Sequence, residues 1–227
     1  MQISQKSCRG IGILGLVLLA LLFPPFFMDA AGWGQAGTPA AATPGTAPDL
    51  KVPAGTLDAV TAILTRRSIR DYSPHPVPKE MIQLLLAAAM SAPSAFNERS
   101  TEFVVISDRQ ILDAIYKLNP NSLQVKRATV AILVCGNQAK EKFPGQGYWQ
   151  LDGAVAAENI LIAAHALGLG AVWTAIYPYP ERIPAVQKLL NLPPQVIPLT
   201  IIPMGYPAEK KMRENRFDAS RVHYNGW

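Results

Sequence analysis

The five-residue segment Arg66-Arg67-Ser68-Ile69-Arg70 brings together the side chains in this sequence that are best suited to bind an anion. A guanidinium stays charged at any workable pH, and its planar set of donors matches the oxygen edge of a phosphate. Ser68 adds a short hydroxyl donor between the arginines. The segment therefore predicts a phosphate-binding loop. The composition alone leaves open a second interpretation, in which the segment is a solvated basic turn.

The overall composition is that of a globular protein with a mildly basic charge. The chain has 227 residues, of which 49% are hydrophobic and 16% charged, and its formal net charge is +5. No long run of Lys and Arg indicates nucleic-acid binding. The two cysteines are too few for a disulfide framework, and the three scattered histidines do not have the spacing of a metal site. This balance fits a small phosphate-bearing ligand.

The segment 1–31 has the pattern of an export signal. Lys6 and Arg9 precede an apolar run over 11–23, and small residues follow at 30–31. A positive start, an apolar core and a small-residue exit are typical of a secretory signal peptide, and an uncleaved N-terminal anchor is the alternative. The sequence therefore predicts export to the bacterial periplasm, or a membrane-anchored protein that faces outside.

The rest of the chain divides into a linker and a folded domain. Residues 32–55 are rich in Ala, Gly, Pro and Thr and carry almost no charge, which is typical of a flexible linker. We expect the domain to span residues 56–227 and to begin with Thr56 as the N-cap of a helix.

Apolar periodicity within this domain predicts both helices and strands. Pro198 and Pro203 lack an N–H donor, so the last strand is predicted to be an edge strand or interrupted. No strand leads into G-x-G-x-x-G, which excludes a Rossmann dinucleotide site. Helices are predicted after Thr56 and over residues 78–90, 108–118, 148–167 and 184–190, and strands over residues 103–106, 129–135, 171–174 and 196–204. The strand over 103–106 is predicted to be buried, because it contains a β-branched run.

Four motifs, taken in order, resemble the FMN-dependent nitroreductase family. The resemblance covers about residues 57–227. It implies an α+β, nitroreductase-like fold, with a central mostly antiparallel sheet flanked by helices, and an intertwined homodimer that binds FMN at each interface. The polar tail ending in Trp227 resembles the arm that embraces the partner. The motifs are residues 66–70, Ala92-Pro93-Ser94 with Asn97, Ala157–Leu161 leading to Gly168-Leu169-Gly170, and Met204-Gly205-Tyr206-Pro207.

The resemblance also implies a cofactor-binding role for each matching residue. One group would hold the phosphate and ribityl end of FMN, namely Arg66, Arg67, Ser68, Arg70 and, in the tail, Arg216, with Lys211 and Arg213 as further candidates. A second group would surround the flavin ring: Pro93, Ser94, Ala95 and Asn97 from the partner chain, Asn121 and Gln124 at the pyrimidine edge, and Ala175 and Ile176 through backbone N–H groups near N5 and O4.

By this resemblance the chain is an FMN-dependent oxidoreductase of nitroreductase type. It would pass hydride from NAD(P)H through FMN to nitroaromatic or quinone-like acceptors in a ping-pong cycle. Because the cofactor carries the chemistry, no catalytic side chain is predicted. Phe143, Tyr148 and Trp149 are candidates for lining the acceptor.

Two alternatives stay open. A reductive dehalogenase-like relative would use Glu141, Lys142 and Tyr148 as a substrate-ordering lid. An exported flavin-binding protein would use an electron donor other than nicotinamide, because NAD(P)H is cytoplasmic and the sequence predicts export.

Overall fold

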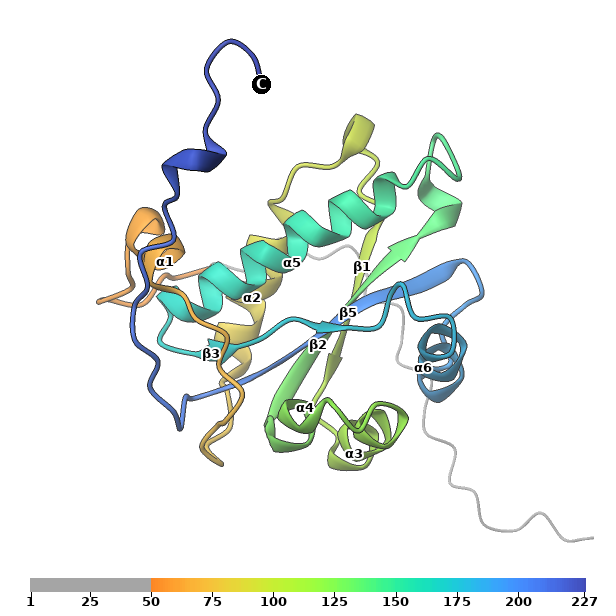
Figure 1. Ribbon diagram of the computed structural model, residues 1–227. Helices are drawn as coiled ribbons and strands as arrows, with labels where there is room; N and C mark the ends of the chain where they lie inside the picture. The colour runs from red at the N-terminus through yellow and green to blue at the C-terminus, as the bar shows by residue number, and fades with distance from the viewer. Residues whose placement is uncertain (1–49) are drawn as a thin grey trace, which may run out of the picture. The chain divides into compact units, whose positions relative to one another are not determined.

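A computed structural model describes residues 50–227, which are built around a five-stranded sheet (Figure 1). The predicted signal peptide or anchor and most of the predicted linker lie outside the described residues. The helices are α1 (Ala59–Thr65), α2 (Lys79–Met90), α3 (Arg109–Leu118), α4 (Leu123–Arg127), α5 (Tyr148–Ala166) and α6 (Arg182–Leu190), and the strands are β1 (Thr101–Ile106), β2 (Val130–Asn137), β3 (Gly170–Ala171), β4 (Thr174–Ala175) and β5 (Val196–Gly205).

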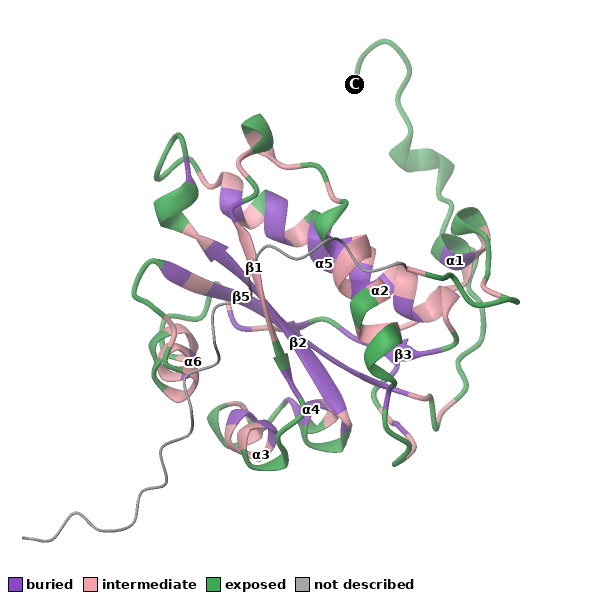
Figure 2. Cartoon of the chain, turned by 180° about the vertical axis from the view of Figure 1, so that it is seen from behind, coloured by how far each residue is buried: buried purple, intermediate pink, exposed green. Residues whose placement is uncertain are grey.

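The sheet is antiparallel and has helices on both faces, which confirms the predicted α+β fold class. Its strand order is β1-β2-β5-β3, and β4 also pairs with β5. Side chains alternate between the two faces along β2. Ile132 packs against the cluster that includes α2 and α5, whereas Leu133 packs against the cluster that includes α3 and α6. In Figure 2 the central strands β2 and β5 are buried along most of their length.

Of the two alternatives predicted for the last strand, the edge strand is wrong, because β5 is central and pairs with three other strands, whereas interrupted pairing is confirmed by a register shift in its ladder with β2. The two prolines occupy positions where pairing is already irregular. Pro198 lies opposite Cys135, where the register of β2 shifts. Pro203 lies between Ile201, which pairs with β4, and Met204, which pairs with β3. The missing N–H groups are therefore tolerated inside the sheet.

Two other strand predictions also need correction. The strand expected over 171–174 is divided into β3 and β4, which are separated by Val172 and Trp173. The strand expected to be buried over 103–106 is the edge strand β1, in which Val105 is 42% exposed. Both errors have one origin: an apolar run indicates a strand but not its length or its neighbours.

The helix predictions are more accurate because helix ends carry local signals. Asp108 caps α3, since its carboxylate accepts from the N–H groups of Gln110 and Ile111 at 2.7 and 3.1 Å. Helix α5 spans Tyr148–Ala166, close to the predicted 148–167. A Cβ atom on Gly153 would lie 2.6 Å from the Leu199 side chain, so this glycine allows α5 to lie close against the sheet.

Helix α1 differs from its prediction in both its cap and its orientation. Its N-cap is Asp58, whose carboxylate accepts from Thr61 N–H at 3.0 Å, rather than Thr56. The apolar side chains of Val60, Ile63 and Leu64 are each more than half exposed. The periodicity therefore identified a helix, but its three large apolar side chains do not pack into the core of their own chain.

Candidate functional site

Part of the arginine segment lines a basic cavity of about 430 Å³. Its position depends on Ile69, a buried residue whose N–H donates to the carbonyl of Ala171 in β3 at 3.1 Å. Gly170 makes room for this contact, because a Cβ atom there would lie 2.5 Å from the Ile69 side chain. The cavity is lined by Arg67, Ser68, Arg70, Lys211, Met212, Glu214 and Arg216.

The C-terminal tail closes this cavity through contacts with the arginine segment. The Arg67 guanidinium donates to the carbonyls of Met212 and Glu214 at 2.9 and 3.3 Å. The Lys211 ammonium donates to the carbonyl of Ser68 at 2.7 Å. These bonds join residues that lie more than 140 positions apart in the chain, so the tail supplies one wall of the candidate phosphate-binding cavity.

Arg70 is the cation in this cavity that is best placed to bind a ligand. Its backbone N–H donates to the Glu209 carboxylate at 2.5 Å. That bond, together with Lys211, holds the pKa of Glu209 below its usual value. The Arg70 guanidinium itself has no hydrogen-bond or ion-pair partner within residues 50–227, whereas Arg216 is paired with Glu214 at 3.4 Å. The N–H donors of the Arg70 guanidinium are therefore free to bond to a phosphate in the cavity.

Arg66 is separated from the other predicted phosphate ligands. It ends helix α1, and its Nε lies 3.2 Å from the carboxylate of Glu158 on α5. It is not among the residues that line the basic cavity. The structure therefore brings Arg67, Ser68, Arg70 and Arg216 together in one cavity, whereas Arg66 is paired with Glu158 outside it, and its role as a phosphate ligand stays a prediction.

The predicted ring-lining loop borders a second cavity, of about 540 Å³, whose lining includes Pro93, Ser94 and Asn97. The loop has an unusual backbone: Phe96, Asn97 and Arg99 all have left-handed φ values, of 51°, 58° and 51°. Non-glycine residues rarely adopt this conformation, and it is common at functional sites. The loop is therefore held in place by other contacts.

Those contacts centre on Asp152, a residue of α5 that is 6% exposed. Its Oδ1 accepts from the Ala95 N–H at 2.9 Å, while Oδ2 has no partner among the described residues. Within the loop, the Ser94 hydroxyl accepts from the Arg99 N–H at 3.1 Å. Asp152 is not among the site residues predicted from the sequence, although an acidic residue in an alanine-rich helix is a detectable signal.

The residues predicted at the pyrimidine edge lie close to β4. The Gln124 amide donates to the Thr174 hydroxyl at 3.0 Å, and Asn121 is exposed at the start of the same segment. Ala175 is half-buried in β4. Ile176 is buried, and its N–H donates to the carbonyl of Leu199 at 3.1 Å. The N–H of Ile176 is therefore engaged within the chain and not available to a flavin.

The aromatic residues proposed for the acceptor side divide into two groups. Trp149 is buried and packs against Tyr177, with ring centroids 5.2 Å apart. Phe143 and Tyr148 instead surround the exposed ring of Phe96, with centroid distances of 4.8 and 5.6 Å. Phe143 and Tyr148 thus remain candidates for the acceptor side, whereas Trp149 belongs to the core.

The lid expected of a dehalogenase-like relative is not assembled. Glu141 is buried, and its carboxylate accepts from the Trp149 N–H at 3.3 Å at the start of α5. Lys142 lies over the rings of Phe96 and Phe143. The acidic member of the proposed lid is therefore buried and bonded at the start of a helix.

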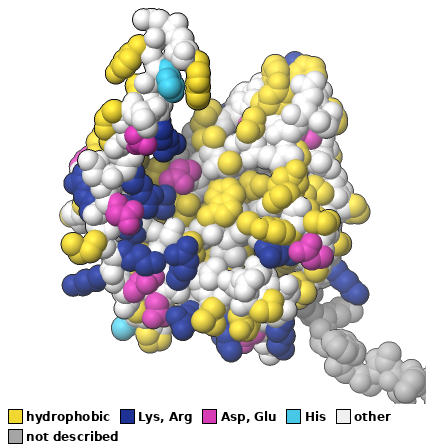
Figure 3. Space-filling view, viewed as in Figure 1, with side chains coloured by type: hydrophobic (Ala, Val, Ile, Leu, Met, Phe, Trp, Pro, Cys, Tyr) yellow, Lys and Arg dark blue, Asp and Glu magenta, His cyan; other side chains and the backbone are white. Residues whose placement is uncertain are grey.

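Charge is unevenly distributed over the face that carries the basic cavity. Figure 3 shows Lys and Arg side chains gathered on the side where α1 and the C-terminal tail lie, next to a hydrophobic area in the middle of that face. The part of the chain that the structure describes contains no group of His, Cys, Asp and Glu suited to holding a metal ion. The arrangement fits an anionic group at one end of an aromatic ligand.

Comparisons with known proteins point to one family. A model described as the nitroreductase family matches residues 63–151 and 125–206. A protein of Methanothermobacter thermautotrophicus, provisionally named NADH dehydrogenase/NAD(P)H nitroreductase, is 46% identical over 171 residues, which is 75% of this chain and 88% of that protein.

Solved structures agree with this match. One from Bacteroides thetaiotaomicron, with the same provisional name, has 45% identity and a TM-score of 0.70 over 74% of this chain and 98% of its own. Another, a provisionally named nitroreductase from Desulfovibrio desulfuricans in complex with FMN, has 30% identity and a TM-score of 0.65 over 74% of this chain and 97% of its own. The predicted cofactor and reductant agree with these names.

The prediction that the protein is exported is wrong in the light of these relatives. Two of them are named for the use of NAD(P)H, a cytoplasmic reductant, and the match covers 88% and 98% of their own lengths. The pattern behind the prediction, in residues 1–31, lies outside the described residues. Within residues 50–227, no helix combines the length and apolar character of a membrane span. Without export, there is no reason to expect an electron donor other than nicotinamide.

Proposed function

Because the chain belongs to the nitroreductase family, as its motifs predicted, we propose that it is an FMN-dependent oxidoreductase that uses NAD(P)H to reduce nitroaromatic or quinone-like acceptors in a ping-pong cycle. The observation that carries this proposal is the basic cavity in which the Arg70 guanidinium has no partner among the described residues. Bound FMN supplies the hydride-transfer chemistry, and the protein supplies binding, orientation and electrostatics.

The residues around the basic cavity fit the phosphate of FMN. Arg70 and Ser68 offer charge-assisted and neutral donors to phosphate oxygens. Arg67 acts mainly through the tail, because its donors are already bonded to the carbonyls of Met212 and Glu214. Arg216 lines the same cavity and adds positive charge from the tail. The phosphate end is thus held between the arginine segment and the tail.

Gln124 is the side chain best placed to address the pyrimidine edge of the ring. Its amide has two N–H donors. One bonds to the Thr174 hydroxyl. The backbone carbonyl of Thr174 in turn accepts from the Thr200 hydroxyl at 2.9 Å. The second N–H remains to stabilise negative charge that develops on a bound ring, which is an electrostatic contribution of the kind that dominates many active sites.

The site is completed by a second copy of the chain in this proposal. The basic cavity and the cavity beside the Pro93–Asn97 loop share no lining residue. Helices α1 and α5 also expose apolar side chains, including Ile63 at 55% and Leu151 at 62%. Exposed apolar patches of this kind indicate an interface. We therefore place the loop of one protomer against the flavin held by its partner.

Absorbance spectroscopy tests the activity. We expect the purified full chain to show the spectrum of bound flavin, which bleaches under anaerobic conditions on addition of NADH or NADPH. Initial rates at several acceptor concentrations then give the parallel reciprocal lines of a ping-pong cycle. Flavin that only dithionite bleaches would contradict the NAD(P)H assignment, and a chain that cannot be loaded with FMN would contradict the cofactor.

Subunit mixing tests the shared site. Arg70→Ala and Asn97→Ala each damage both sites of a homodimer, but a mixed dimer has one intact site if the two residues act across the interface. Mixing the two impaired variants after reversible dissociation is then expected to raise the activity above that of either variant alone. The shared-site proposal is wrong if the mixture is no more active than the two variants measured separately, or if light scattering finds only monomers.

A further inference from the structure

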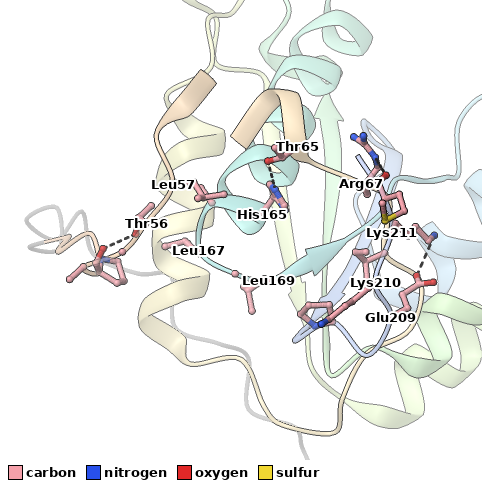
Figure 4. A pocket seen from close by; sticks show the side chains of 18 residues that line it. Thr56, Leu57, Thr65, Arg67, His165, Leu167, Leu169, Glu209, Lys210 and Lys211 are labelled. Carbon is pink, nitrogen blue, oxygen red and sulfur yellow. Dashed lines mark hydrogen bonds and ion pairs between the residues drawn. The ribbon is translucent and has the colours of Figure 1, made fainter. Parts of the chain in front are cut away.

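A cavity of about 690 Å³ lies next to the basic cavity and has no role in the proposed function (Figure 4). It is bounded by the segments around Leu57, Thr65, His165 and Lys210. Three residues, Arg67, Lys211 and Met212, line both this cavity and the basic one, so they form the wall between the two. Its volume falls within the range of cavities that bind small molecules, roughly 300–1,000 Å³.

A hydrogen-bond chain fixes the state of the histidine in this cavity. The Thr65 hydroxyl lies 2.6 Å from the carbonyl of Thr61 and 2.8 Å from Nε2 of His165. A carbonyl only accepts, so the single hydroxyl hydrogen goes to Thr61, and the hydroxyl oxygen must accept from His165 Nε2–H. In the neutral ring this leaves Nδ1 as an acceptor.

The neutral ring is favoured by its surroundings. Burial is the main cause of a pKa of His165 below the ordinary 6.5, and the nearby charges of Arg66 and Arg67 lower this pKa further. Within the described residues nothing donates to His165 Nδ1. The histidine that lines this cavity therefore has one ring acceptor, Nδ1, for which the described residues supply no donor.

The remaining walls define the rest of the ligand. Leu57, Leu167 and Leu169 provide apolar surface (Figure 4). Lys210 lines the same cavity and has no ion-pair partner among residues 50–227, whereas the neighbouring Glu209 is already engaged by the Arg70 N–H and by Lys211. The complementary molecule has an apolar body, one hydrogen-bond donor and one negative charge.

We propose that this cavity is a second small-molecule site, separate from the flavin site, which binds an aromatic anion that carries a hydroxyl or N–H donor. The apolar body packs against the leucines, the donor bonds to His165 Nδ1, and the anionic group faces Lys210. All residues that define the site lie within residues 50–227 of one chain, and the site does not depend on which acceptor the enzyme reduces.

Histidine-ring nitrogen NMR with 8-anilinonaphthalene-1-sulfonate as the probe tests this proposal. The probe has an aromatic body, one N–H and one sulfonate. The experiment uses the full chain with excess FMN, so that the flavin site is filled. With three histidines in the chain, the His165 signals are assigned by their loss in His165→Phe. We expect the probe to shift the Nδ1 resonance of His165 and to leave that of exposed His75 unchanged.

Two variants and a control make the test specific. Ala54→Trp fills the cavity from its exposed rim, and His165→Phe removes the acceptor; each is expected to weaken probe binding at least fivefold. His75→Phe changes a histidine outside the cavity and should bind as the native protein does. Thermal unfolding and flavin absorbance establish that each variant is folded and loaded.

The proposal is overturned by any of three results: the native protein does not bind the probe, the probe binds without shifting the His165 resonance, or Ala54→Trp binds it with native affinity. The last two results would mean that the probe stacks elsewhere, for example at the acceptor side of the flavin.

Discussion

The basic cavity around Ser68 and the loop beside Asp152 form the two ends of the proposed flavin site, and different forces hold them in place. The first is exposed and charged, and its tail wall is attached by hydrogen bonds from Arg67 and Lys211. The second is a strained loop held by a buried carboxylate that accepts from Ala95. The phosphate end therefore depends on charge, whereas the ring end depends on a fixed backbone geometry.

This difference has consequences for how each region fails. Contacts between exposed charges are typically worth about 0–1 kcal/mol and weaken with salt. A buried donor that loses its partner costs about 1–3 kcal/mol whatever the salt concentration. We therefore expect substitutions at the phosphate end to change affinity in a salt-dependent way, and substitutions at the loop to change stability and geometry.

The largest expected effect is that of Arg70→Ala. The Arg70 guanidinium has no partner among the described residues. Its removal deletes a charge-assisted contact with the phosphate and weakens FMN binding by about 1.5–3 kcal/mol, or roughly one to two orders of magnitude in affinity. Fluorescence titration of FMN measures the change. Arg66→Ala is the matched control, because Arg66 pairs with Glu158 outside the cavity. Equal losses in the two variants would contradict the separation of the two arginines.

Asp152→Ala tests the buried anchor of the loop. It leaves the Ala95 N–H without its partner, so we expect a loss of about 1–2 kcal/mol in the free energy of unfolding, measured in urea. Asp152→Asn keeps an acceptor oxygen and should lose less. Asp113→Ala, which breaks only a half-exposed ion pair with Arg109, serves as the control. If Asp152→Ala is no less stable than Asp113→Ala, the loop does not depend on this anchor.

Arg216→Ala is expected to have a smaller effect. Arg216 is 65% exposed and already paired with Glu214, so its contribution to FMN affinity should be below about 1 kcal/mol, or less than about fivefold. Titrations at low and high NaCl concentration measure how the effect depends on salt, and the difference from the native protein should disappear at high salt. A difference that persists there would place Arg216 in direct, desolvated contact with the phosphate.

The smallest effect concerns pH. Because burial lowers the pKa of His165 in the folded state, the unfolded chain binds more protons between that lowered pKa and the ordinary 6.5. Stability is therefore complete above about pH 6.5 and decreases as the pH falls through the folded-state pKa. Urea unfolding between pH 7.5 and 5 should show a shallower decrease for His165→Phe than for the native protein or for His75→Phe. Identical slopes would exclude His165 as the cause.

Much of the fold was predictable because helix ends carry local chemistry. The Asp108 cap lies directly before α3, and the alanine-rich run before Gly168 delimits α5. The role of a proline in a strand is not local, since Pro203 is tolerated only because β3 and β4 pair with β5 on either side of it. For the same reason, the exposed apolar residues of α1 could be recognised as helical without revealing what they pack against.

The candidate site shows the same limit. The residue types of the segment 66–70 are sufficient to predict a phosphate-binding loop, because three guanidiniums and a hydroxyl have that chemistry in any fold. Only the tertiary structure decides that Arg67 and Arg70 share a cavity with Arg216, while Arg66 turns to Glu158. Side-chain direction depends on where helix α1 ends and where the tail returns, and neither is encoded within five residues.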